Sequence, residues 1–265
     1  MSISSSVRIF FVGGLISYRG LFQWIRPSVY IPTMLGAPLF QILFFTYLGR
    51  YAETGQDDAF FVVGNAVQVC GMSCVYGMTM AVANERWFGT LGPLLATPAN
   101  RAAIFLGRGV PVFANGLLVS VFGFCVGALL LDVHPAAGSI PALALVVCVT
   151  TISCTAFGMV LGSIGLRSKD FFFVANMAYF LMLLFCGVNI PLSVLPEWMS
   201  AIGRCLPLTH GIMAARQVAA GADLADVSGL LWTELGVAAA YAAAGYVLFR
   251  VLERASRRSA VLDAL

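Results

Sequence analysis

The chain has 265 residues, of which 60% are hydrophobic and only 10% are charged. A soluble domain carries about 25% charged residues, so this composition excludes an ordinary globular domain. It also excludes a disordered chain, which needs low hydrophobicity to stay solvated. The net charge of +3 does not indicate a nucleic-acid surface, which shows clustered basic residues with interleaved aromatics. We therefore expect the lipid bilayer, and no nucleic acid, among the partners of this chain.

The first 26 residues contain Arg8, Arg19 and Arg26 among apolar side chains. These arginines break up the continuous apolar stretch that a signal peptide needs. We predict instead that residues 1–26 form an amphipathic segment that lies in the membrane interface. An ill-ordered tail is the alternative.

Six long apolar runs follow, each close to the roughly 20 residues that a helix needs to cross a hydrocarbon core about 30 Å thick. Glu234 alone interrupts the last run. We predict an all-α, polytopic membrane protein with six transmembrane helices. The predicted spans are residues 27–49, 59–84, 109–131, 139–165, 171–190 and 228–250.

The positive charges predict the orientation of these spans. Of the 15 Lys and Arg residues, 12 lie in the N-terminal segment, in the connections between spans two and three and between spans four and five, and in the tail from residue 250. Arg50, Arg204 and Arg216 lie on the other side. Because Lys and Arg accumulate in cytoplasmic loops, both termini, including the tail 251–265, are predicted to be cytoplasmic.

The connection 85–108 is too apolar to be a simple link. Leu91, Leu94 and Leu95 are spaced i, i+3 and i+4 and share one face of a short helix, and Pro93 suits its first turn. An apolar knob on a cytoplasmic helix fits a groove on a partner; packing under the bundle is the alternative. The charged rim expected around this contact consists of Glu85, Arg86, Arg101 and Arg108.

The connection 191–227 lies on the opposite, outer side and begins at an Asn189-Ile190-Pro191 break. It is too apolar for a free loop and too interrupted for a span. We predict short helices that dip partly into the outer leaflet, because broken backbone at that depth must pack in protein or line a cavity. Cys186 and Cys205 could both lie on this side, and the sequence leaves their pairing open.

Familiar catalytic motifs are absent from the sequence. Ser168, rather than the glycine of a phosphate-binding loop, precedes Lys169, which is the only lysine. His134 and His210 stand alone, and neither a Cys-x-x-Cys pair nor a G-x-S-x-G elbow occurs. We therefore expect no enzyme activity, metal or cofactor on this chain. Paired intramembrane carboxylates, typical of proton-driven carriers, are also missing, so energy for transport is expected from a partner on the cytoplasmic side.

The segment from Glu85 to Pro98 resembles the E-x-x-x-G-T-L-x-x-L-x-x-T-P signature of type-2 ABC exporter permeases, and it falls between spans two and three, as in that family. The outer connection and a Gly36-Ala37-Pro38 break in the first span are also similar to that family. A departure is Gly92-Pro93, where a polar helix former usually follows the leucine. The signature residues are Glu85, Gly89, Thr90, Leu91, Leu94, Leu95, Thr97 and Pro98. The candidate site residues of the outer connection are Pro191, Leu195, Pro196, Trp198, Pro207 and Arg216.

This resemblance implies a single ABC-2 type transmembrane domain over residues 1–265. It implies that the 85–98 helix couples the chain to a separate ABC ATP-binding subunit, which holds ATP and magnesium. Two such subunits and two permease chains, identical or related, are expected to form an exporter in the prokaryotic inner membrane.

Polar side chains within the spans indicate a weakly polar path for a substrate. For any single one of them a hydrogen bond between helices is the favoured explanation, but together with neighbouring aromatics they favour a hydrophobic or amphipathic substrate such as a drug, antibiotic or lipid. The alternatives are export of a lipid-linked surface polysaccharide, an integral membrane enzyme acting on lipids, and a structural scaffold. The candidate path residues are Gln41, Asn65, Gln68, Asn176, Tyr179 and Asn189.

Two further patterns concern packing. Pairs of small residues four apart allow helices to cross closely, within the chain or between protomers. Glu234 is the only acid within a predicted span, and we expect it to pair with Arg204 or Arg216. The small-residue pairs are Gly123 with Gly127 and Gly158 with Gly162.

Overall fold

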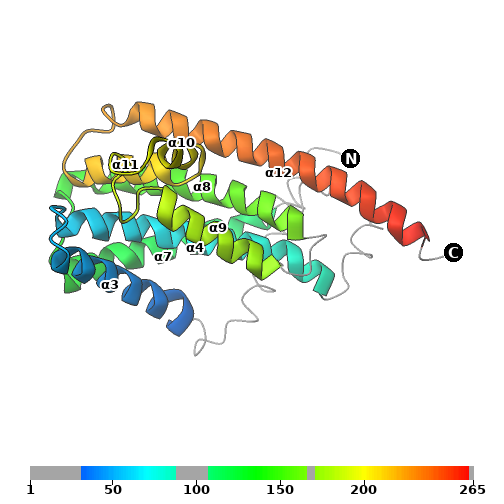
Figure 1. Cartoon of the computed structure of the whole chain (residues 1–265), viewed down its shortest axis with the longest axis horizontal. Helices are drawn as coiled ribbons and strands as arrows, with labels where there is room; N and C mark the ends of the chain where they lie inside the picture. The colour runs from blue at the N-terminus through cyan, green and yellow to red at the C-terminus, as the bar shows by residue number, and fades with distance from the viewer. Residues whose placement is uncertain (1–30, 88–106, 166–170, 263–265) are drawn as a thin grey trace.

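A computed structural model shows a bundle of long helices that run roughly side by side (Figure 1). It describes the backbone of residues 31–87, 107–165 and 171–262, and the side chains in these ranges except 82–87, 137, 165, 171 and 252–262. Within these ranges the chain forms helices and irregular segments but no strands, which confirms the predicted all-α class for this part. The predicted amphipathic segment 1–26 lies outside the described residues.

The helices follow one another along the chain as long antiparallel elements, with two short helices before the last. A π-helical turn, η1, leads into α3, and a 3₁₀ turn, η2, leads into α8. The bounds are η1 Ile31–Gly36, α3 Ala37–Tyr51, α4 Asp58–Trp87, α7 Gly109–Leu130, η2 Ala137–Ser139, α8 Ile140–Gly165, α9 Phe171–Phe185, α10 Glu197–Cys205, α11 Thr209–Ala219 and α12 Ser228–Leu262.

Among the described residues, 5 helices are long and apolar enough to cross a membrane: η1 with α3, α4, α7, α8 and α12. The chain is therefore a multi-pass membrane protein. The helices α7 and α8 agree with the predicted spans 109–131 and 139–165 to within one residue. The last helix, α12, runs on to Leu262, so most of the predicted tail continues this helix. The remaining predicted span, 171–190, corresponds to α9, which has 15 residues; a sixth crossing stays a prediction.

The early end of α9 has a local cause. Gly187 has a φ of +73°, a left-handed conformation that glycine adopts at no steric cost. Irregular backbone then continues from residue 186 to residue 196. The break predicted at Asn189-Ile190-Pro191 is thus present, but the helix already ends at Phe185.

The predicted break in the first span is also present. The helix changes from π to α geometry between Gly36 and Ala37. Pro38 lies in the first turn of α3, and because proline has no N–H to continue the helical ladder, it accounts for the change in geometry at this point. The sequence signal and the change in geometry therefore coincide.

The helix α4 forms the centre of the bundle. Its residues 61–71 are all buried, because α3, α7, α8, α9 and α11 pack around it. Glycines allow two of these helices to approach closely: a Cβ on Gly127 of α7 would lie 2.2 Å from Val62, and one on Gly158 of α8 would lie 2.8 Å from Met78. Gly127 and Gly158, one glycine from each small-residue pair, therefore contribute to packing within the chain.

One end of the bundle carries α10, α11 and the loops 52–57 and 131–136 (Figure 1). We call it the α10–α11 end. Here α11 packs against α4, α8 and α12, and α10 packs against α9 and α11. The short helices predicted within residues 191–227 are therefore present, and they are packed against the long helices rather than forming a free loop.

Arg108 corrects one expectation. It does not form an exposed rim around the 85–98 helix, because its side chain is buried and Nη1 donates a 3.0 Å hydrogen bond to the carbonyl of Ala81. A desolvated guanidinium needs such acceptors, so Arg108 joins the start of α7 to α4. The side chains of the other expected rim residues, Glu85, Arg86 and Arg101, lie outside those described.

Candidate functional site

Four uncharged polar side chains, from α3, α4, α9 and the irregular segment after α9, form one network near the α10–α11 end. Gln41 of α3 donates a 3.0 Å hydrogen bond to Asn65 of α4. Asn65 donates to the side-chain oxygen of Asn189, at 2.7 Å, and to the carbonyl of Phe61, at 2.9 Å. Tyr179 of α9 donates to Gln41 at 2.7 Å. We call Gln41, Asn65, Tyr179 and Asn189 the polar cluster; all four were predicted as path residues.

A second polar pair lies beside this cluster. The Tyr76 hydroxyl of α4 donates to the Asn176 side chain of α9 at 2.5 Å, and Asn176 donates back to the carbonyl of Phe172 at 2.8 Å. The Tyr76 and Tyr179 rings lie 6.5 Å apart, so the pair and the cluster are neighbours. A fifth predicted path residue, Asn176, therefore lies beside the other four.

The sixth predicted path residue, Gln68, does not join them. It is fully buried in α4, and neither of its amide atoms has a hydrogen-bond partner among the described residues. Asn189 also keeps one buried donor, Nδ2, without a partner in this part of the chain. Since a buried polar atom normally finds a partner, Asn189 Nδ2 is the one donor of the polar cluster that is unsatisfied among the described residues.

Arg216 of α11 fixes the backbone next to the polar cluster. Its guanidinium donates to the carbonyl oxygens of Gly187 at 2.8 Å, Val188 at 2.6 Å and Phe60 at 3.0 Å. It also lies 3.4 Å above the centre of the Phe60 ring. Burial lowers the pKa of Arg216 to about 9, so the group keeps its proton at neutral pH. Arg216 therefore holds the irregular segment after α9 against the start of α4.

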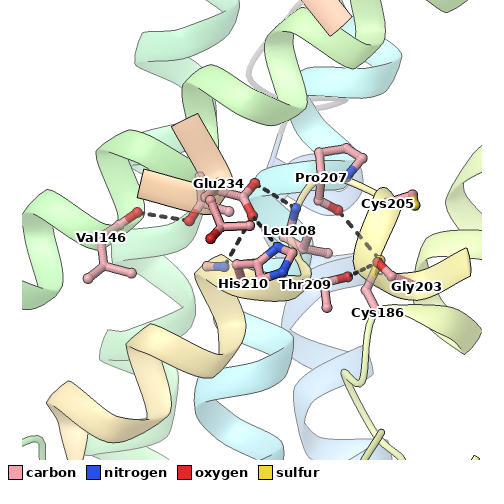
Figure 2. A network of polar contacts seen from close by, with 12 residues as sticks. Val146, Cys186, Gly203, Cys205, Pro207, Leu208, Thr209, His210 and Glu234 are labelled. Carbon is pink, nitrogen blue, oxygen red and sulfur yellow. Dashed lines mark hydrogen bonds and ion pairs between the residues drawn. The ribbon is translucent and has the colours of Figure 1, made fainter. Parts of the chain in front are cut away.

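Glu234 does not pair with Arg204 or Arg216, so that prediction is wrong. Its fully buried carboxylate accepts hydrogen bonds from the backbone amides of Leu208, at 2.9 Å, and Gly211, at 3.3 Å (Figure 2). The start of a helix offers unpaired N–H groups and a partial positive charge, which serve here in place of an arginine. His210, expected to stand alone, has its Nδ1 3.7 Å from this carboxylate.

The sequence marked Glu234 as unusual but could not show its partners. Amide donors at the start of α11 belong to the backbone and leave no trace in residue types. Arg204 and Arg216 therefore seemed the obvious counter-charges. The useful signal was Pro207, because a proline just before a short apolar helix often marks a helix start.

The other predicted residues of the outer connection lie around α10. Pro196 caps this helix, and Trp198, which is 62% exposed, packs on the ring of Phe185. The Pro207 carbonyl accepts a 3.5 Å hydrogen bond from the thiol of Cys186. Cys186 and Cys205 are both free thiols. Pro191 and Leu195 lie in the irregular segment that leads into α10.

The predicted coupling helix lies mostly outside the described residues. Glu85 is in the last turn of α4, where only the backbone is described. The remaining signature residues are in the segment 88–106, outside the described ranges. They are Gly89, Thr90, Leu91, Leu94, Leu95, Thr97 and Pro98.

The long apolar helices define a polytopic membrane protein. A family model for the ABC-2 type transporter matches residues 14–219, which include the whole polar cluster and the 85–98 segment. The chain therefore belongs to the ABC-2 type transporter family. Glu234 lies beyond the matched residues.

Two curated relatives have the same description, a probable multidrug ABC transporter permease YbhR, and come from Escherichia coli strain K12 and Escherichia coli O157:H7. Each is 24% identical over 196 residues, which cover 73% of this chain and 53% of the relative. This chain thus spans about half the length of these relatives.

Proposed function

We propose that this chain is the transmembrane permease subunit of an ATP-driven exporter that moves a hydrophobic or amphipathic substrate out across the inner membrane. The observation that supports this most is the polar cluster. Its amides and phenol bond to one another across the bundle, and Asn189 Nδ2 has no partner among the described residues. Uncharged hydrogen-bonding groups between apolar helices suit a substrate with an apolar body and a few polar groups.

The proposed substrate is a drug, antibiotic or lipid. The amides and the phenol of the polar cluster are uncharged at neutral pH, so the cluster offers no counter-charge to an ion. An exposed aromatic borders it: the ring of Phe180 of α9, which is 59% exposed, lies 5.4 Å from the Tyr179 ring. The word "multidrug" in the description of the two curated relatives favours the same class. Transport of a lipophilic drug and of a lipid-linked oligosaccharide is measured in competition. Preferred transport of the drug supports this proposal, and preferred transport of the oligosaccharide supports polysaccharide export.

The proposed orientation places the α10–α11 end outside and both termini in the cytoplasm. It is supported by the distribution of Lys and Arg, 12 on one side against 3 on the other. The loop Glu53 to Asp57, which is acidic, then faces outward, and the 85–98 segment faces the cytoplasm.

The proposed energy source is a separate ABC ATP-binding subunit, present in two copies with ATP and magnesium, and two permease chains form the path. The sequence carries no phosphate-binding loop. The leucines of the 85–98 segment supply the proposed contact. Closure of the ATP-binding subunits would push on this helix and open the path between the two permease chains.

Co-purification with the ATP-binding subunit tests this contact. Leu94→Arg buries a charge in the apolar contact and should abolish co-purification and ATP-dependent transport. Leu94→Met keeps the apolar volume and should preserve both. Undiminished binding and transport by Leu94→Arg would refute the proposed docking.

A further inference from the structure

The Glu234 carboxylate binds to the backbone of one short helix rather than to a cation. Both oxygens are used, one by the amide of Leu208 and one by the amide of Gly211, and the side chain is fully buried (Figure 2). His210 Nδ1, at 3.7 Å, is beyond hydrogen-bond distance from the carboxylate. The link therefore joins the start of α11 to the second turn of α12 through backbone amides.

The residue that begins this link has an uncommon backbone conformation. Leu208 has a φ of +89° and is fully buried. A bulky residue adopts such a conformation only where its surroundings over-determine it. The hydrogen bond from its own amide to Glu234 is one of the contacts that hold this turn, together with the bond from the Thr209 hydroxyl to the Gly203 carbonyl.

The opposite end of α11 reaches the polar cluster. Arg216 donates to the carbonyls of Gly187 and Val188, and the next residue, Asn189, accepts a hydrogen bond from Asn65. The close approach at this point leaves no spare room, since a Cβ on Gly64 would lie 2.5 Å from both Arg216 Nη2 and the Val188 oxygen. The helix α11 thus connects Glu234 at one end to the position of Asn189 at the other.

We propose that Glu234 is a positioning residue: by holding the start of α11, it keeps Arg216 and the segment Gly187 to Asn189 closed over the polar cluster. Release of the Glu234 contact lets α11 and this segment move away together and opens the cluster at the α10–α11 end. We call Glu234, α11 and Arg216 the α11 tie. Its consequence for transport rests on the proposed function, whereas the tie itself is a property of this chain alone.

The native cysteines provide a direct test in the full-length chain reconstituted in lipid vesicles. Cys186 is buried beneath the Pro207 carbonyl, Cys205 is exposed, and Cys154 is buried in α8. N-ethylmaleimide labelling of each thiol is followed by mass spectrometry of its peptide. In Glu234→Gln, one amide at the start of α11 loses its acceptor, so the labelling rate of Cys186 relative to Cys205 should rise at least about tenfold, while Cys154 stays protected.

Two matched variants separate the tie from general loosening. His210→Ala removes the nearest side chain but leaves both amide contacts, and it should leave Cys186 as protected as in the wild type. Arg216→Gln frees the far end of α11, and it should expose Cys186 while Glu234 is intact. Both changes break the same α11 tie. Cys186 in the double variant Glu234→Gln with Arg216→Gln should therefore be labelled no faster than in the faster single variant.

The result that would overturn the proposal is unchanged Cys186 labelling in Glu234→Gln. If Glu234→Gln exposes Cys154 as much as Cys186, the chain has loosened as a whole, and the Arg216→Gln result decides: protected Cys186 in that variant also overturns the proposal. Labelling requires neither substrate nor ATP-binding subunit. A wild-type complex with the ATP-binding subunit that fails to transport would therefore refute the proposed function and leave the tie standing.

Discussion

The polar cluster and the Glu234 contact lie at the same end of the molecule but are built from different chemistry. In the polar cluster, uncharged side chains bond to one another across α3, α4, α9 and the segment after α9. At Glu234, a buried carboxylate bonds to backbone amides of a single helix. Amide side chains exchange partners at low cost in a membrane, whereas a buried carboxylate that loses its donors is heavily penalised. The first arrangement suits a site that must rearrange around a ligand, and the second suits an anchor.

The largest effect is expected at the anchor. Glu234→Leu removes the acceptor of two buried amides, so we expect the free energy of unfolding to fall by about 4 kcal/mol. Glu197→Leu is the control, because Glu197 is exposed at the first turn of α10 and should change this free energy by less than about 1 kcal/mol. Denaturant unfolding in detergent measures both. Equal losses in the two variants would show that Glu234 is not an anchor.

The next effect concerns the space around the anchor. A Cβ on Gly211 would lie 2.1 Å from the Thr150 hydroxyl oxygen of α8, so Gly211→Ala should lower the free energy of unfolding by about 2 kcal/mol. A Cβ on Gly236 of α12 would meet open space, and Gly236→Ala should raise this free energy by up to about 1 kcal/mol through helix propensity. The same unfolding assay compares them. If both glycines tolerate alanine, the close packing of α11 on α8 is not a source of stability.

Within the polar cluster we expect a smaller loss in the free energy of unfolding than at Glu234 or Gly211, together with a large loss of transport. Asn65→Leu removes the residue that bonds to both Gln41 and Asn189, at a cost of about 1 kcal/mol in the free energy of unfolding. Its transport rate should fall at least about tenfold. Gln68→Leu is the matched control on the same helix: it removes a fully buried amide whose atoms have no partner among the described residues, so it should leave transport nearly unchanged and should not lower the free energy of unfolding. Equal transport rates for the wild type, Asn65→Leu and Gln68→Leu would show that the polar cluster is not part of the transport path.

The smallest effect is expected beside the polar cluster. Tyr76→Phe removes one hydrogen bond to Asn176, in a side chain that is already partly exposed, and should lower the free energy of unfolding by about 0.5 kcal/mol. We expect the apparent KM for transport to change by no more than about threefold. A loss of transport as large as that of Asn65→Leu would move the centre of the site toward Tyr76.

The parts of the fold that depend on hydrophobic length were predictable. The spans at α7 and α8 follow from apolar runs that only a helix can satisfy in lipid, and five of the six path residues meet because amides in an apolar bundle seek partners. The early end of α9 was not predictable, because the sequence does not reveal that Gly187 is the glycine with a left-handed φ. The partner of Glu234 was missed because charge patterns show side chains and not backbone donors.

The central claim is that this chain forms a path that a partner drives with ATP. It is tested most directly by ATP-dependent uptake of an uncharged amphipathic dye into inside-out vesicles that contain this chain and its ATP-binding subunit. We predict uptake by the wild-type complex, loss in Leu94→Arg, and at least about a tenfold reduction in Asn65→Leu with ATP hydrolysis retained. Dye uptake that is the same in Asn65→Leu as in the wild type, or that continues in Leu94→Arg, would contradict the account.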